Sequence, residues 1–240
     1  MSIDAFSPEL LKYSKSRNPE PPLHLGTRYD LSGNFQYEPG NTIVCHVVDG
    51  SETQRAVVAA REKYLAMEEA PQFTFTPISS LHMTLFQGII EYRRTARHWP
   101  AGIALDTPID EMTEIMAERL SHFKKRDPFK VAVTSARPAG LLVDGATEED
   151  RKIMRDWRNA LADLLGYRHP DHDTYPFHIT FCYVIERLED TALRRWQAML
   201  DDVAAELRRD MPVLELNPPV FCSFDDMNHF EELLVLDFEQ

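Results

Sequence analysis

The sequence predicts a protein of mixed helices and strands that is built from two similar lobes. Each half of the chain shows the same order of expected elements: a strand, a helix, a strand with a His-x-Thr motif, a helix and a further strand. The chain has 240 residues, 43% of them hydrophobic, which is enough to bury the core of one larger domain or of two small lobes. Identity between the halves is low, so the similarity is one of pattern rather than a demonstrated duplication.

In the first half, the turn signal Ser32-Gly33-Asn34 favours a hairpin, and the β-branched run NTIVCHVV favours a strand. Ser51 is a suitable N-cap for a helix whose apolar residues recur at helical spacing. A second helix ends in a basic turn that suits the helix dipole. In chain order we expect a hairpin over 23–40, a strand over 41–48, a helix over 51–67, an extended piece over 73–77, a His-x-Thr strand over 79–90, a loop over 100–108, a helix over 109–125 and a strand over 129–136.

The second half repeats this order. Its first helix has Thr147 as N-cap, acidic residues in its first turn and Gly166 after its last turn. In chain order we expect a strand over 140–145, a helix over 146–166, a loop over 167–176, a His-x-Thr strand over 178–186, a helix over 188–209 and strands over 219–224 and 232–238.

The net charge of −13 argues against an extended nucleic-acid-binding surface, because such surfaces neutralise phosphates with clustered Lys and Arg. It leaves room for a small phosphate ester in a locally basic cleft. Two basic clusters are candidates for such a cleft, although both also fit a solvated helix end or loop. They are Arg93, Arg94, Arg97 and His98, and Lys124, Lys125, Arg126 and Lys130.

We expect a cytoplasmic protein. No run approaches the ~18 apolar residues of a membrane span, and the polar, proline-containing N-terminal stretch lacks the apolar core of a secretory signal. Cys45, Cys182 and Cys222 are too widely and irregularly spaced for a disulfide framework or a zinc site. They lie in apolar runs, where reduced and buried thiols are expected.

The two His-x-Thr motifs are the strongest functional signal. Side chains of successive strand residues face opposite sides, so His82 and Thr84 share one face, as do His178 and Thr180. If two similar lobes pack about a pseudo-twofold axis, the two motifs face each other across a central cleft. Imidazole can act as base when neutral and as acid when protonated, and a hydroxyl can donate a hydrogen bond to a phosphate oxygen.

Paired H-x-T motifs on separate strands resemble those of the two-histidine (2H) phosphoesterase superfamily. The flanks SSLHMTLF and YPFHITFCY, with GTRYDLSGNF and PGNTIVCH upstream, are similar to one poorly characterised branch of it. The likeness runs from about Leu25 to the C-terminus. It implies an α+β fold of two pseudo-symmetric lobes with antiparallel sheets around a central cleft. It also implies an N-terminal arm over 1–24 and one bilobal domain over 25–240. The two halves that form the lobes lie near 41–136 and 140–240, and whether the lobes exchange strands stays open.

The resemblance implies a metal-independent enzyme that needs no cofactor. Its relatives hydrolyse 2′,3′-cyclic or related cyclic phosphates, or 2′,5′-phosphodiester bonds. By position, the catalytic histidines fall on His82 and His178 and the phosphate-binding hydroxyls on Thr84 and Thr180. The expected partner is a small phosphoester or a short oligonucleotide as substrate. No binding to a membrane is expected, and a monomer is the favoured oligomeric state.

Five further residues are weaker substrate-binding candidates. Phe86 continues the face of the first motif and can stack on a base, although filling the core is the commoner role of such a residue. Tyr175, just before the second motif, can reach phosphate through its hydroxyl. Arg28, Tyr29 and Asn41 lie in the upstream segments that carry the branch resemblance.

Three alternative interpretations were weighed. The loop residues His169, Asp171, His172 and Asp173 are possible metal ligands, but a proline-broken loop imposes no fixed ligand geometry. A non-catalytic module that binds a phosphorylated nucleotide is disfavoured by the intact histidines, because Arg or Lys serves simple phosphate binding better. A ligase or transferase that joins RNA ends is disfavoured by the acidic charge and the missing nucleotide-binding glycine-rich loop.

Overall fold

The structure is a computed structural model that describes residues 6–238. Its strands are β1 (Gly40–His46), β2 (Phe73–Phe75), β3 (His82–Ile90), β4 (Val131–Arg137), β5 (Gly140–Gly145), β6 (His178–Thr180), β7 (Cys182–Val184), β8 (Val220–Phe224) and β9 (Glu231–Val235). Its α-helices are α1 (Pro8–Leu11), α2 (Glu52–Leu65), α3 (Ile109–Leu120), α4 (Glu148–Leu165) and α5 (Leu193–Asp210).

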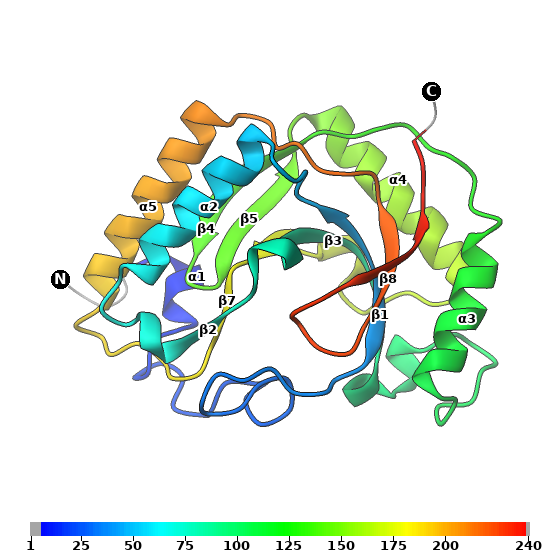
Figure 1. Ribbon diagram of the computed structural model, residues 1–240, viewed down its shortest axis with the longest axis horizontal. Helices are drawn as coiled ribbons and strands as arrows, with labels where there is room; N and C mark the ends of the chain where they lie inside the picture. The colour runs from blue at the N-terminus through cyan, green and yellow to red at the C-terminus, as the bar shows by residue number, and fades with distance from the viewer. Residues whose placement is uncertain (1–5, 239–240) are drawn as a thin grey trace.

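All strands pair antiparallel, which confirms the predicted α+β class. Seven strands form one sheet in the order β4-β5-β6-β3-β1-β8-β9, and β2 pairs with β7 in a small second sheet (Figure 1). The large sheet curves like an arch. α5 packs against β4 and carries α2 beside it, α4 packs against β5 and β3, and α3 packs against β3, β1 and β9. A large apolar core lies between the helices and the sheet.

The predicted helix ends are confirmed at α2 and α4. Ser51 accepts a hydrogen bond from the Gln54 N–H and so caps α2. Thr147 and Asp150 form a reciprocal capping box at the start of α4. Gly166 ends α4 with a φ of 78°, a conformation that glycine adopts without strain.

The two halves of the chain exchange strands. β4 comes from the first half and pairs with β5 of the second half, whereas β8 comes from the second half and pairs with β1 of the first. The sheet is continuous because β3 and β6 also pair, with Met83 opposite Ile179. Each end of the sheet is therefore built from both halves of the sequence.

Three predicted elements differ clearly from those observed, and one of them is the helix predicted over 188–209, which begins at Leu193. The helix predicted over 109–125 ends at Leu120, where the chain makes a tight turn in which Ser121 bonds back to Glu118 through both its N–H and its hydroxyl. The single strand predicted over 178–186 is divided at Phe181. That residue donates to the Ala139 carbonyl and accepts from the Thr76 N–H, so the chain leaves the large sheet there and joins β2.

Residues 6–24, expected to be an arm, are packed against the rest of the chain. Leu10 of α1 is fully buried, and the Ser14 hydroxyl donates to Asp190 just before α5. The hairpin predicted around Ser32-Gly33-Asn34 forms, with a bridge between Tyr29 and Phe35. Among the described residues, no helix has the length and apolarity needed to span a membrane.

Candidate functional site

The two His-x-Thr motifs lie side by side on β3 and β6. Because Met83 faces Ile179 in an antiparallel pair, the same register places His82 opposite Thr180 and Thr84 opposite His178. The local pseudo-twofold axis thus passes through the Met83–Ile179 pair. His82 and His178 are diagonal neighbours in this register. The backbones of diagonal neighbours in an antiparallel pair lie ~7–8 Å apart. All four motif side chains line one cavity of about 710 Å³.

Both histidine rings are held in the same way by the backbone two residues earlier. Nδ1 of His82 lies 2.7 Å from the Ser80 carbonyl oxygen, and Nδ1 of His178 lies 2.8 Å from the Pro176 carbonyl oxygen. A carbonyl only accepts, so Nδ1 carries the proton and donates it in each bond. Nε2 is therefore the nitrogen of each ring that can take up or release a proton.

Burial lowers the pKa of both motif histidines. The pKa of His82 falls to about 3, mainly through desolvation and then through the nearby His46. The pKa of His178 falls to about 4, mainly through desolvation and then through the positive charge of Arg137. Both imidazoles are consequently neutral at pH 7 when nothing is bound.

His82 is packed between two further rings. His46 of β1 pairs opposite His82 of β3, with the two ring centroids 5.8 Å apart. The Phe230 ring packs edge to face with the His82 ring, with the ring centroids 4.4 Å apart. His46 itself lies 3.8 Å from Glu232, and burial lowers its pKa despite that carboxylate. These contacts fix the orientation of the His82 ring as well as its protonation state.

Tyr175, a predicted substrate-binding candidate, lines the cavity beside the second motif. The centre of its ring lies 5.8 Å from the centre of the His178 ring, and both residues line the cavity. The buried guanidinium of Arg158 lies 4.7 Å from the centre of the Tyr175 ring. Burial raises the pKa of Tyr175 to about 12, so the hydroxyl stays protonated and can donate to an anion.

Phe86 does not face the cavity, so its predicted role in stacking on a base is wrong. β1 pairs Val44 with Thr84 but Ile43 with Phe86, which leaves Leu85 as the extra residue of a β-bulge. The bulge shifts the alternation by one, and Phe86 is 1% exposed on the core side. Arg158 stabilises this arrangement by donating to the Leu85 carbonyl. Gln87, one residue on, lines the cavity instead.

The three upstream candidates line the cavity but have different roles. Asn41 is fully buried, and its side-chain amide accepts from the Ile89 N–H and donates to Thr113, so these contacts hold it in the cavity wall. Tyr29 is buried and donates its hydroxyl proton to the Val184 carbonyl. Arg28 is buried in an ion pair with Glu38 at 2.6 Å.

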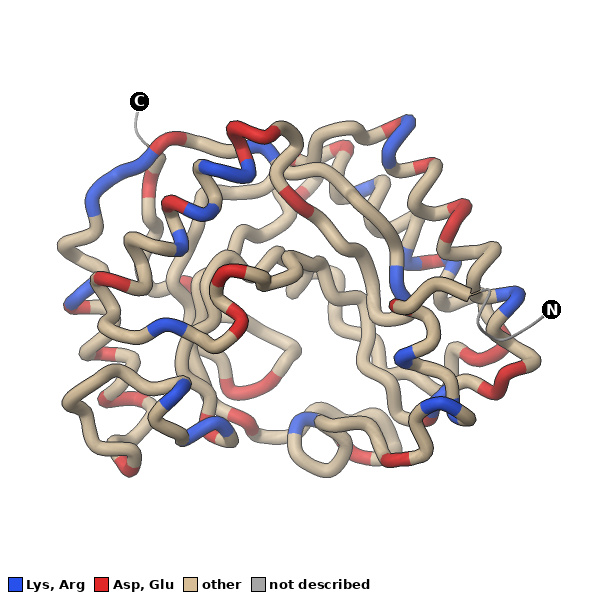
Figure 2. The backbone as a smooth tube through the Cα atoms, turned by 180° about the vertical axis from the view of Figure 1, so that it is seen from behind, with Lys and Arg blue, Asp and Glu red and all other residues tan. Residues whose placement is uncertain are grey.

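Arg137 and Arg93 are among the cavity residues that were not predicted as site residues. Arg137, the last residue of β4, lines the cavity beside His178, and its Nε is buried without a hydrogen-bond partner. Arg93, singled out only as part of a basic cluster, lines the same cavity. The second predicted basic cluster, around Lys124, contributes nothing to the cavity wall. Figure 2 shows that most acidic and basic residues lie on the outer helices and loops rather than on the central strands.

The histidine-rich loop before the second motif is packed rather than arranged as a metal site. Within residues 6–238, no group of three His, Cys, Asp or Glu side chains is placed to hold a metal ion. Nε2 of His172 bonds to Asn159, and the His169 ring packs against Tyr167 and His98.

The comparisons with known proteins agree with this fold. The family model 2H-phosphodiest, described as a domain of unknown function (DUF1868), matches residues 28–142, which include the first motif but end before the second. A crystal structure of the conserved protein of unknown function ATU0111 from Agrobacterium tumefaciens str. C58 is similar over 96% of this chain and 100% of that chain, with 51% identity and a TM-score of 0.95. No curated protein matches the chain. The chain belongs to the 2H phosphoesterase family.

Proposed function

We propose that this family member is a metal-independent phosphodiesterase that hydrolyses a small cyclic phosphate, such as a 2′,3′-cyclic nucleotide, or a 2′,5′-phosphodiester. His82 and His178 are the acid–base pair. The observation that carries this proposal is the matched geometry of the motifs: each histidine is anchored through Nδ1 to the carbonyl two residues before it, and the two rings flank one pseudo-twofold axis.

The reaction requires a general base and a general acid on opposite sides of the phosphorus. One imidazole takes a proton from water through Nε2 as the water attacks, and the other gives a proton to the departing sugar oxygen. Attack and departure occur roughly in line, so two rings across a pseudo-twofold axis suit both tasks. Which ring takes which role depends on the orientation of the substrate.

The remaining polar groups suit the charge that develops on the phosphate. The Thr84 and Thr180 hydroxyls lie opposite the two histidines and can donate to the non-bridging oxygens. Arg137 supplies a positive charge beside His178 that no carboxylate within ion-pair distance neutralises among the described residues. A bound phosphate would complete this hydrogen-bonding set.

The test is turnover of 2′,3′-cyclic nucleotides and short 2′,5′-oligonucleotides in excess EDTA. We expect wild-type turnover to survive EDTA and to fall by ~10²–10⁴-fold in His82→Ala and in His178→Ala. His122→Ala, at an exposed position outside the cavity, is the matched control and should keep wild-type activity. Turnover that disappears with EDTA, or that survives in both motif variants, would contradict the mechanism. Tight phosphate-ester binding without any turnover would identify a non-catalytic binding module instead.

A further inference from the structure

Arg93 occupies the end of the cavity that is remote from the two motifs. It closes the short turn Glu91–Arg93 that follows β3, whereas His82 begins that strand. The cavity wall between them is formed along β3 by Gln87, Gly88 and Ile90. Nine residues of extended strand span roughly 30 Å, a length that the bulges shorten only in part. The cavity is therefore elongated, with a basic side chain at its far end.

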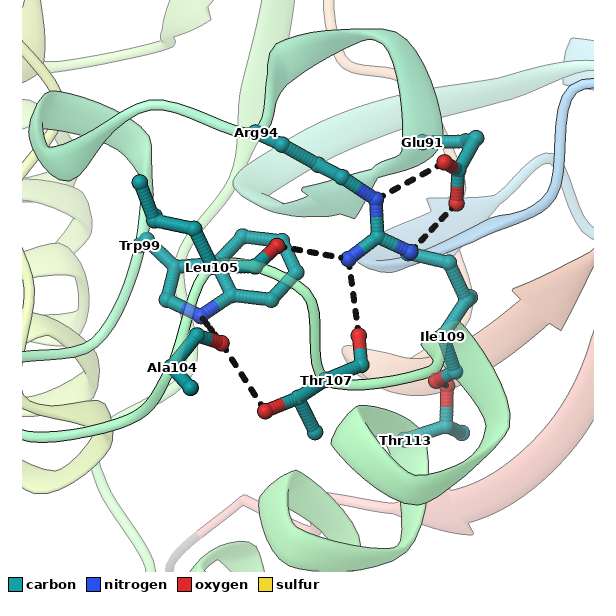
Figure 3. A network of polar contacts seen from close by, with 8 residues as sticks. All are labelled: Glu91, Arg94, Trp99, Ala104, Leu105, Thr107, Ile109 and Thr113. Carbon is teal, nitrogen blue, oxygen red and sulfur yellow. Dashed lines mark hydrogen bonds and ion pairs between the residues drawn. The ribbon is translucent and has the colours of Figure 1, made fainter.

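The Arg93 guanidinium lacks the hydrogen-bond and ion-pair partners that the Arg94 guanidinium has. Its Nε and Nη2 are buried without a hydrogen-bond partner, and no carboxylate of the described residues lies within ion-pair distance of it. Arg94, the next residue, is fully engaged by Glu91 and by the carbonyls of Leu105 and Thr107 (Figure 3). An arginine with two buried, unpaired nitrogens is costly unless a ligand or water satisfies them.

The surroundings of Arg93 carry uncompensated positive potential. Its charge contributes to lowering the pKa of His24 to about 4, after desolvation and the charge of Arg28, and that of His169 to about 3, after desolvation. His169 is 4% exposed, and both its ring nitrogens lack a hydrogen-bond partner. Such an environment favours a bound anion.

The turn that carries Arg93 is held in place before any ligand arrives. Glu91 and Arg94 bridge the end of β3 to the segment before α3, as Figure 3 shows. The Arg94 guanidinium also lies 5.1 Å from the centre of the Trp99 ring, which is buried. A preorganised position reduces the entropy lost when Arg93 binds an anion.

We infer that Arg93 forms a second anion subsite, which binds a phosphate remote from the one that reacts between His82 and His178. The ligand is accordingly an elongated molecule that carries a phosphate at each end. This inference rests on the proposed function only in assigning the reacting phosphate to the two histidines. One mononucleotide is too short to reach both ends of the cavity.

The experiment measures binding rather than turnover. Uridine oligonucleotides of one to four units, each ending in a 3′-phosphate, would be titrated calorimetrically in forms with and without a 5′-phosphate. We expect the 5′-phosphate to tighten binding to the wild type by about tenfold or more at one of the longer lengths, the effect of charge-assisted hydrogen bonds. The gain should vanish in Arg93→Gln and persist in Arg97→Gln, an exposed arginine four residues after Arg93.

Unchanged affinity of Arg93→Gln for the 5′-hydroxyl probes would show that the variant is folded. The inference is overturned if the 5′-phosphate adds no affinity at any length, or if its gain survives in Arg93→Gln. Failure of the proposed function would appear separately, as an absence of turnover on cyclic substrates, and would leave the difference between the paired probes measurable.

Discussion

The identical backbone anchors of His82 and His178 determine what each ring can do. With Nδ1 donating to a carbonyl, only Nε2 exchanges protons, and the ring cannot flip without losing that bond. The two rings nevertheless differ in surroundings. His46 and Phe230 pack against His82, whereas Arg137 and Tyr175 lie beside His178. Similar anchoring in different surroundings suits two groups that perform opposite proton transfers.

The lowered pKa values predict the pH dependence of activity. In the free enzyme the pKa values are about 3 for His82 and about 4 for His178, so the ring that acts as acid loses its proton well below pH 7. We expect kcat/KM, which reports the free enzyme, to fall as pH rises above that pKa. A bound phosphate anion raises the pKa of the acid, so the alkaline limb of kcat should lie at higher pH than that of kcat/KM.

Both profiles would be measured from about pH 4 to about pH 9. If the alkaline limbs of kcat and of kcat/KM coincide, bound substrate leaves the pKa values of the histidines unchanged. If neither kcat nor kcat/KM changes with pH, paired histidine catalysis is excluded.

Arg137 carries a second prediction at this scale. Its positive charge lowers the pKa of His178, so Arg137→Gln should raise that pKa and move the corresponding limb of the pH profile to higher pH. Loss of a charged donor to the phosphate should also reduce kcat/KM by about 10–100-fold. Arg137→Lys keeps the charge and should keep the limb near its wild-type position. If Arg137→Gln moves neither the limb nor kcat/KM, Arg137 does not contact the phosphate.

The sequence predicts some cavity residues and not others for a physical reason. His82, Thr84, His178 and Thr180 follow from strand alternation, a local property, and all four line the cavity. The prediction for Phe86 is wrong because one inserted residue in β3 reverses the alternation of side chains. The Arg158 contact that stabilises this bulge comes from α4, which is distant in sequence. Arg137 and Arg93 have no sequence signal of this kind, because their places depend on how remote segments close the cavity.

At the scale of elements, close packing of β5 against β6 positions the second motif. Gly140 begins β5 opposite Thr180 and has a φ of +139°. A Cβ added there would lie 2.1 Å from the Ile179 carbonyl oxygen, so the two strands could not keep their present spacing. The approach of β5 therefore requires glycine at this position.

Gly140→Ala should destabilise the protein and displace β6. We expect the free energy of unfolding to fall by about 1–3 kcal/mol, from the clash and the backbone strain together. Turnover should also fall at temperatures where the variant is still folded, because His178 and Thr180 move with β6. Gly102→Ala is the control: its φ is +82°, but an added Cβ meets nothing within 4 Å. If both variants lose stability equally and Gly140→Ala keeps full turnover, close packing does not position the motif.

The existence of most helices and strands could be predicted, but their pairing could not. Cap residues and hydrophobic periodicity are local, and they give α2, α4 and α5 within a few residues. Strand order depends on contacts between distant segments. The predicted strand over 178–186 is divided because Phe181 bonds to Ala139 and to Thr76, two positions far from it in sequence.

At the scale of the whole molecule, the exchanged strands predict that the two halves of the chain fold only together. Residues 1–138 contain β1 without its partner β8 and β4 without its partner β5. Residues 139–240 contain β6 and β8 without β3 and β1, which lie between them in the sheet. Each fragment would thus expose unpaired strand edges and the apolar face that the other half covers.

We therefore expect the intact chain to unfold in urea in one transition, coincident by far-UV circular dichroism and by the fluorescence of Trp99, Trp157 and Trp196. Neither fragment should unfold cooperatively when expressed alone, whereas co-expressed fragments should form a complex that does. The family model ends at residue 142, close to this division, so a fragment ending at 138 contains nearly all of the matched region. Cooperative unfolding of that fragment by itself would show that β1, β3 and β4 are stable without β5 and β8. The cavity would then form by docking of two preformed units rather than in the single folding step that the sheet order requires.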